Sequence, residues 1–132
     1  MLGAVGDDRR RLVLIDDSEI ILAVMRAKLT EAGFDVRAVS SLPAFLNAVL
    51  DFRPHVIVTD LYMPEMSGGE LTKWLRAHLQ TAPTPIVIYS SAPEAELAEV
   101  TRAVGADAYV SKEAGAETLA ARLHALCDDI VW

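Results

Sequence analysis

The chain has 132 residues, of which 52% are hydrophobic and 23% are charged, and its formal net charge at pH 7 is −7. This composition is typical of one globular domain, which at this length can bury a core without disulfides or a structural metal. The acidic balance, with no basic cluster beyond Arg9 to Arg11, argues against direct nucleic-acid binding. The apolar run from Ile20 to Met25 is too short for a membrane span, which needs about 20 residues.

The two ends of the chain are predicted to differ in order. Residues 1–10 are predicted to be a disordered leader, because their basic residues follow a short apolar stretch, the reverse of a secretory signal. Residues 11–132 form one predicted domain. Its single cysteine, Cys127, lies near Leu126 and Ile130 and is predicted to be a small buried residue without a disulfide partner. A reducing, cytoplasmic location fits these features best.

Five segments have the composition of buried strands. Four of them are almost continuously apolar and rich in branched residues, which is typical of strands covered on both faces of a parallel sheet. In chain order the segments are LVLI at 12–15, the weaker VRAV at 36–39, VIVT at 56–59, IVIY at 86–89 and AYV at 108–110.

Segments with helical spacing of apolar residues lie between these strands. They contain Leu42, Phe45, Leu46, Val49 and Leu50; Leu71, Trp74, Leu75, His78 and Leu79; and, in a last helix running to Trp132, Leu119, Leu123, Leu126 and Ile130. The predicted helix starts are Ser41 and Pro93, the predicted helix ends are Gly33 and Gly105, and Gly68 and Gly69 are expected to allow turns. We therefore predict five βα units in a doubly wound α/β fold.

Polar residues arrive where the apolar strands end. They are Asp16, Asp17, Asp60, Ser90 and Lys112. Taken singly, each has an ordinary explanation: Asp17 or Ser18 can cap a helix, and the others can lie in turns, in loops or in solvent. Because parallel strands end at one edge, however, we expect the five side chains to converge. Three carboxylates brought together must raise their pKa values or bind a cation, and oxygen ligands suit Mg²⁺.

Such a site favours phosphoryl chemistry. One aspartate can act as a nucleophile toward phosphorus, while Mg²⁺ and an ammonium group neutralise the phosphoryl oxygens. Lys112 would supply the ammonium group. The hydroxyl of Ser90 could donate to a phosphoryl oxygen and so couple the chemistry to the loop that follows.

Four motifs in this order resemble the receiver domain of bacterial response regulators. They are VLIDDS at 13–18, VTDLYMPEMSG at 58–68, PIVIYSSA at 85–92 and GADAYVSK at 105–112. The resemblance covers about residues 11–130. It implies a flavodoxin-like, five-stranded parallel sheet with five helices and strand order 2-1-3-4-5, in a stand-alone form of the chemotaxis type.

The resemblance also implies the site residues. Asp60 is the implied phosphoacceptor, and Asp60, Asp17 and the backbone carbonyl of Tyr62 are implied ligands of Mg²⁺. Asp16 is implied to contact metal-bound water. Lys112 is implied to contact the phosphoryl group, as is Ser90.

Further positions are implied to control the response. Ser90 and Tyr109 take the places of the family's switch residues, although Tyr109 could instead pack against the last helix. Tyr62 and Ala92 occupy the positions that tune phosphoryl lifetime, and neither can orient an attacking water. Many family members have a proline after the lysine, whereas this chain has Lys112-Glu113, so a cis bond is not expected there.

The predicted function is therefore that of a response regulator phosphorylated on Asp60 by a histidine kinase or a histidine phosphotransfer protein. It would signal through a surface change to a downstream protein effector, with homodimer formation left open. It would not be an enzyme beyond its own phosphorylation and dephosphorylation. The alternative is a receiver-like interaction domain that does not use phosphate. A flavodoxin-type enzyme is disfavoured, because Asp16 and Asp17 would repel a cofactor phosphate.

The apolar run from Ile20 to Met25 sweeps more than a full helical turn, so the sheet cannot cover all of it. We predict that some of these six residues face outward, beside Asp17 and Asp60, and dock the helix bundle of a histidine phosphotransfer partner. Ile21, Leu22 and Met25 are the candidates for substitution, depending on which of them is exposed. Coverage by neighbouring helices or by a dimer is the alternative.

Overall fold

The computed structural model describes residues 9–129. Five strands in this range form one parallel sheet. The strands are β1 (Arg10–Ile15), β2 (Phe34–Val39), β3 (Val56–Thr59), β4 (Ile86–Ser90) and β5 (Ala108–Ser111). Their order is β2-β1-β3-β4-β5, and β1 pairs with both β2 and β3. The predicted doubly wound, flavodoxin-like fold is confirmed. The direction of strand order reverses between β1 and β3, where ligands bind in such sheets.

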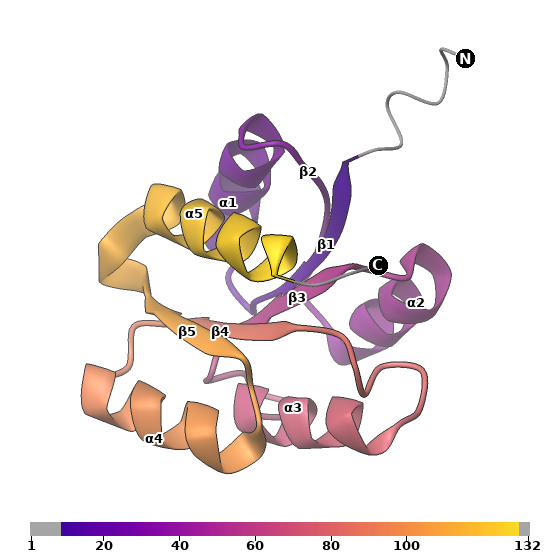
Figure 1. Cartoon of the computed structure of the whole chain (residues 1–132), viewed down its shortest axis with the longest axis vertical. Helices are drawn as coiled ribbons and strands as arrows, with labels where there is room; N and C mark the ends of the chain where they lie inside the picture. The colour runs from indigo at the N-terminus through magenta and orange to yellow at the C-terminus, as the bar shows by residue number, and fades with distance from the viewer. Residues whose placement is uncertain (1–8, 130–132) are drawn as a thin grey trace.

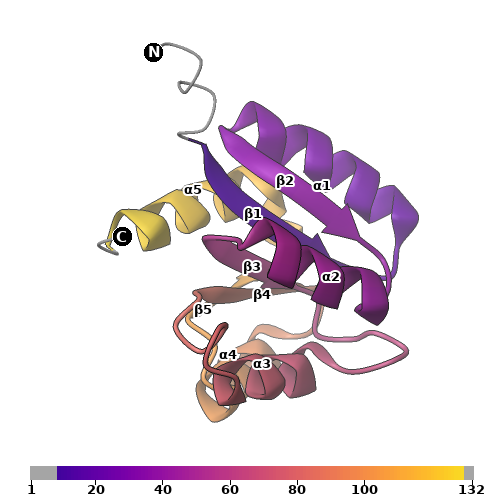
Figure 2. The ribbon, with the colours of Figure 1, turned by 90° about the vertical axis from the view of Figure 1, so that its right-hand side faces the viewer.

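Helices cover both faces of the sheet (Figures 1 and 2). One face carries α1 (Glu19–Glu31) and α5 (Gly115–Asp128), and the other carries α2 (Leu42–Phe52), α3 (Gly68–Ala77) and α4 (Glu94–Val104). A short 3-10 turn, Lys112–Ala114, links β5 to α5.

Alternating strand residues separate the core into layers. Leu12 and Leu14 pack into the core beneath α1 and α5, whereas Val13 and Ile15 pack toward α2 and α3. All four side chains are almost fully buried. Coverage on both faces explains why the strand sequences are continuously apolar rather than alternating.

The helix boundaries follow most of the predicted signals. The Ser41 hydroxyl caps α2, and Pro93 directly precedes α4. Gly33 and Gly105 follow the ends of α1 and α4 with positive φ angles of 104° and 81°, a conformation that glycine adopts without a steric penalty.

The spacing of apolar residues predicted a helix that continues through His78 and Leu79, and this part of the prediction is wrong. Helix α3 stops at Ala77, and the Leu79 side chain is 93% exposed. The Thr81 hydroxyl donates to the Leu75 carbonyl at 2.6 Å, and the Thr81 N–H donates to the His78 carbonyl at 3.1 Å. These local hydrogen bonds replace the helical pattern and turn the chain toward β4.

The predicted disordered leader, residues 1–10, extends one residue too far, because β1 already begins at Arg10. The Arg10 guanidinium forms a 2.5 Å ion pair with Asp128 and contacts His124 Nδ1. These contacts connect the first residue of β1 to α5. Residues 1–8 and 130–132 lie outside the described residues. The predictions for Ile130 and for a helix running to Trp132 therefore fall outside them as well.

Cys127 is buried as predicted and is a free cysteine, and burial raises the pKa of its thiol. Between residues 9 and 129, no helix combines the length and the apolar character that crossing a membrane requires.

His55 makes the stability of this fold depend on pH. Its Nδ1 accepts a hydrogen bond from the Arg11 N–H at 2.9 Å, and burial, followed by the charges of Arg11 and Arg10, lowers the pKa of its ring. Below the ordinary histidine pKa of about 6.5, the unfolded chain therefore takes up the proton more readily than the folded chain. The contribution of His55 to stability is present above that pH and is lost as the pH falls.

We predict that His55→Asn, which keeps an acceptor but does not titrate, loses less stability than the wild type between pH 7 and pH 5.5. Urea unfolding at a series of pH values measures this. Carboxylates affect both proteins alike, so the difference between the two curves isolates His55. Parallel curves would contradict the prediction.

Candidate functional site

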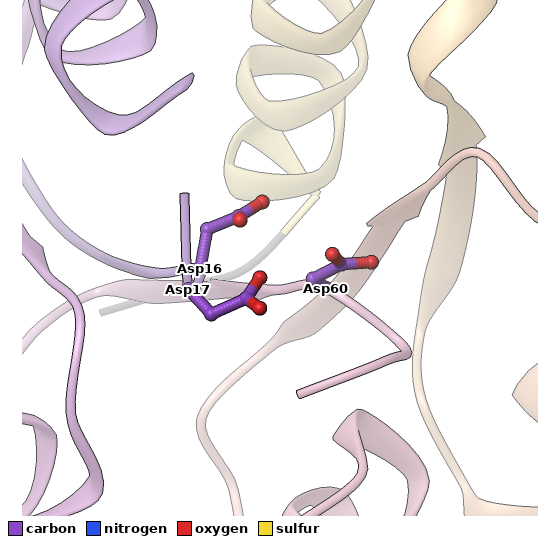
Figure 3. A group of neighbouring side chains, drawn as sticks. All are labelled: Asp16, Asp17 and Asp60. Atoms are coloured by element: carbon purple, nitrogen blue, oxygen red, sulfur yellow. The ribbon is translucent and has the colours of Figure 1, made fainter. Parts of the chain in front are cut away.

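Three carboxylates meet at the carboxyl edge of the sheet (Figure 3). Asp16 and Asp17 follow β1, and Asp60 follows β3. Asp16 and Asp60 are buried, whereas Asp17 is exposed. One oxygen of each carboxylate lies within 4.8 Å of the others. The structure thus brings together the acidic residues that the sequence placed at separate strand ends.

Lys112 joins two of these carboxylates. Its Nζ donates to Asp16 Oδ2 at 2.8 Å and to Asp60 Oδ2 at 3.1 Å. Burial by itself lowers the pKa of Lys112, but the hydrogen bond to Asp16 and the charges of Asp60 and Asp16 outweigh it and raise the pKa overall. Lys112 is therefore an ammonium group at neutral pH. The Lys112–Glu113 peptide bond is trans, as are all those described.

Backbone N–H groups orient the other carboxylate oxygens. Asp16 Oδ1 accepts from the Ser18 N–H at 2.9 Å. Asp60 Oδ1 accepts from the Leu61 N–H at 2.6 Å and from the Tyr62 N–H at 3.5 Å. Each of the two buried carboxylates is therefore held by backbone on one side and by Lys112 on the other. The cap of α1 is Ser18, whose hydroxyl accepts from the N–H of Ile21, and not Asp17.

Gly68 allows α3 to begin against the backbone of the phosphoacceptor candidate. Its N–H donates to the Leu61 carbonyl at 2.8 Å. A Cβ at Gly68 would lie 2.0 Å from the Asp60 carbonyl oxygen, whereas a Cβ at Gly69 would make ordinary contacts of 3.5 Å with Val100 and Val104. The expectation that both glycines serve turns is therefore wrong: neither has a positive φ, and only Gly68 is required, for close approach.

The predicted switch residues lie on β4 and β5. Ser90 is fully buried, and its Oγ accepts from the Ala92 N–H at 3.3 Å. The Tyr109 hydroxyl donates to Glu94 Oε2 at 3.2 Å, and its ring packs on a small core that includes Leu97 of α4. The alternative expectation, that Tyr109 packs against the last helix, is wrong because its ring lies on the α4 face of the sheet.

One interaction had no signal in the sequence. The Tyr62 hydroxyl donates to a carboxylate oxygen of Glu96 in α4. This hydrogen bond, followed by burial, raises the pKa of the Tyr62 phenol. Glu94 and Glu96 could be recognised from the sequence as the acidic first turn of a helix, but their tyrosine partners come from other elements and follow no sequence spacing.

The prediction that part of the run from Ile20 to Met25 faces outward is confirmed, and the large exposed side chains are those of Ile20 and Val24. Ile20 is 78% and Val24 is 47% exposed, whereas Leu22 and Met25 are buried and Ile21 is partly buried. Of the three candidates for substitution, Leu22 and Met25 are not exposed, because their face of α1 packs into the core shared with α5. A pocket of about 230 Å³ lies beside the exposed patch of Ile20 and Val24 and reaches Tyr89 and Lys112.

Comparison with known proteins identifies the class to which this fold and site belong. Residues 12–124 match the response regulator receiver domain family. The chain therefore belongs to that family.

The relatives differ in length. Transcriptional regulatory protein GltR of Pseudomonas aeruginosa is 30% identical over 117 residues, covering 89% of this chain and 48% of GltR. The chain thus spans about half the length of the first curated relatives it matches. Polar-differentiation response regulator DivK of Brucella anthropi is 28% identical over 104 residues, covering 78% of this chain and 84% of DivK. Chemotaxis protein CheY4 of Vibrio cholerae has a similar structure, with a TM-score of 0.80 and 29% identity. The match covers 88% of this chain and 97% of the CheY4 chain.

The two glycines at the start of α3 form a matched pair for testing the close approach. We predict that Gly68→Ala loses about 1–3 kcal/mol of unfolding free energy, because its methyl group overlaps the Asp60 backbone. Gly69→Ala should stay within about 1 kcal/mol of the wild type or gain stability, since alanine is the better helix former. Urea unfolding of both variants measures the difference, and equal losses would show that the close approach is not the constraint.

Proposed function

We propose that this receiver domain accepts a phosphoryl group on Asp60 from the phosphohistidine of a histidine kinase or a histidine phosphotransfer protein. The observation that supports this most directly is the arrangement around Asp60, a buried carboxylate beside Asp16 and Asp17 and bonded to the Lys112 ammonium group. The alternative, an interaction domain that does not use phosphate, gives no reason for assembling these charges.

In the proposed step, a carboxylate oxygen of Asp60 attacks the phosphorus atom. The phosphorus–nitrogen bond of the phosphohistidine breaks, the imidazole leaves with the bonding electron pair, and an acyl phosphate forms on Asp60. A carboxylate is itself a nucleophile, so no general base is needed. Lys112 offers positive charge to the phosphoryl oxygens, and the Leu61 and Tyr62 N–H groups orient the carboxylate.

The donor set at this edge fits Mg²⁺. Three carboxylates offer hard oxygen ligands within 4.8 Å of one another, and Mg²⁺ is usually held by one or two carboxylates together with water. Receiver domains generally bind Mg²⁺ at such an acidic pocket. We propose that Asp17, Asp60 and the Tyr62 carbonyl would hold the ion, with Asp16 contacting its water. When bound, Mg²⁺ would neutralise charge that develops on the phosphoryl oxygens.

The proposed signal begins at Ser90. Ser90 Oγ now accepts from the Ala92 N–H, and movement of this hydroxyl toward a phosphoryl oxygen, to which it would donate, would shift the β4–α4 loop. Tyr109 would then change its position, and the altered α4 surface would be read by a downstream protein effector. The net charge of −7 supports a protein target rather than nucleic acid.

We further propose that the chain catalyses only its own phosphorylation and dephosphorylation. Loss of the phosphoryl group would be slow, because the side chains of Tyr62 and Ala92 offer no carboxylate or amide to hold an attacking water. A cytoplasmic location is supported by the lone, buried thiol of Cys127, which suits a reducing compartment.

Asp60→Asn should abolish phosphoryl uptake from phosphoramidate in Mg²⁺ buffer, because an amide is not a nucleophile toward phosphorus. Intact mass and peptide mapping measure the modification. Asp51→Asn is the control, since Asp51 is an exposed carboxylate paired with Arg37 on another part of the surface. Uptake by Asp60→Asn at the wild-type rate would rule out the assignment.

The exposed patch of Ile20 and Val24 is the proposed docking site for the donor protein. It is apolar, it lies on α1 just after Asp17, and the adjoining pocket leads to Lys112. An apolar helix seated there would bring its phosphohistidine toward Asp60.

We predict that Ile20→Asp and Val24→Asp reduce transfer from a phosphorylated histidine phosphotransfer domain about tenfold or more, while phosphoramidate uptake stays normal. Leu79→Asp is the control, because Leu79 is 93% exposed and lies beyond the end of α3. Equal losses with both donors would point to damaged folding, and unchanged transfer would place the docking surface elsewhere.

A further inference from the structure

Two tyrosines bind the first turn of α4 to other elements. The Tyr62 hydroxyl, from the β3–α3 loop, donates to Glu96, and the Tyr109 hydroxyl, from β5, donates to Glu94 at 3.2 Å. The residue before the helix is Pro93, which makes no side-chain cap hydrogen bond. The start of α4 is thus held by hydroxyl groups through its own glutamates.

Tyr62 contacts both α4 and the proposed phosphorylation site. Its backbone N–H points to Asp60 Oδ1 at 3.5 Å, beside the Leu61 N–H at 2.6 Å. Its side chain is exposed, with 52% of its surface accessible, so burial in the core does not fix the ring. The hydroxyl bond to Glu96 is therefore what defines the position of the Tyr62 side chain relative to α4.

We propose that Glu96 is a positioning residue of the phosphorylation site, which holds Tyr62 and thereby couples the position of α4 to phosphoryl capture by Asp60. This inference rests on the proposed function. It assigns a role to a side chain on a helix, outside the residues that touch the reacting atoms.

The direction of the coupling follows from Ser90. In the arrangement that contains the Tyr62–Glu96 bond, Ser90 Oγ is bonded to the Ala92 N–H of its own loop. Drawing Ser90 toward a phosphoryl group on Asp60 shifts that loop and the first turn of α4, which directly follows it. The Tyr62–Glu96 bond opposes this shift. Because coupling between two sites is reciprocal, releasing the bond must strengthen binding of a phosphoryl group or its mimic.

A charge effect of Glu96 is the competing explanation, because an acidic side chain near the site would repel anionic ligands. Two variants separate the explanations. Tyr62→Phe removes the hydrogen bond and keeps the Glu96 charge, whereas Glu96→Gln removes the charge and keeps an oxygen that can accept the bond.

The experiment measures the equilibrium affinity for beryllium fluoride, a mimic of the phosphoryl group, in Mg²⁺ buffer. We expect Tyr62→Phe and Glu96→Ala each to bind it about two- to fivefold more tightly, in line with an exposed hydrogen-bonded pair. The double variant should gain no more than either single variant, and Glu96→Gln should stay near the wild type. Glu99→Ala, an exposed glutamate further along α4, is the matched control.

Hydrogen exchange at the first turn of α4 gives a second readout. Exchange without beryllium fluoride should be faster in Tyr62→Phe and Glu96→Ala than in the wild type. A gain in Glu96→Gln without one in Tyr62→Phe would establish the charge effect and overturn the proposal, as would single effects that add in the double variant. Failure of the wild type to bind beryllium fluoride would instead refute the proposed function.

Discussion

The contact of the Lys112 ammonium group with Asp16 and Asp60 is the interaction on which the site depends. Burying two carboxylates side by side, with Asp17 next to them, is unfavourable unless positive charge is close. Lys112 directly follows the edge strand β5, whereas the carboxylates follow β1 and β3. Its long side chain must therefore pass the end of β4 to reach both at 2.8 and 3.1 Å. The ion pairs thus connect the end of the edge strand β5 to the ends of the inner strands β1 and β3.

The two faces of the sheet separate the proposed input from the proposed output. The exposed patch of Ile20 and Val24 lies on α1, on the face that α1 shares with α5 (Figure 1). Helix α4, which Tyr62 and Tyr109 hold through its first turn, lies on the other face. Asp60 stands at the sheet edge between them. A donor protein on one face and an effector on the other could therefore bind without competing for the same surface.

Much of the fold was predictable because its signals are local. A strand that is buried on both faces must be apolar throughout, so segments such as 56–59 stand out from the chain. The site was predictable for a related reason, because Asp60 and Lys112 each lie where an apolar strand segment ends and parallel strands end together. Helix α3 shows the limit of such reasoning: Leu79 continues the helical spacing, yet a hydrogen bond from Thr81 ends the pattern earlier.

The sequence by itself determined the five strands, several helix boundaries and the set of charged residues at the carboxyl edge, because each depends on neighbours along the chain. Tertiary structure decided the features that depend on how distant segments meet. Gly68 is required because α3 begins against the Asp60 carbonyl, and the Tyr62–Glu96 bond forms because α4 lies beside the β3–α3 loop. Which side of α1 faces outward was decided in the same way, because a helix that is apolar over more than one face is oriented by what packs against it.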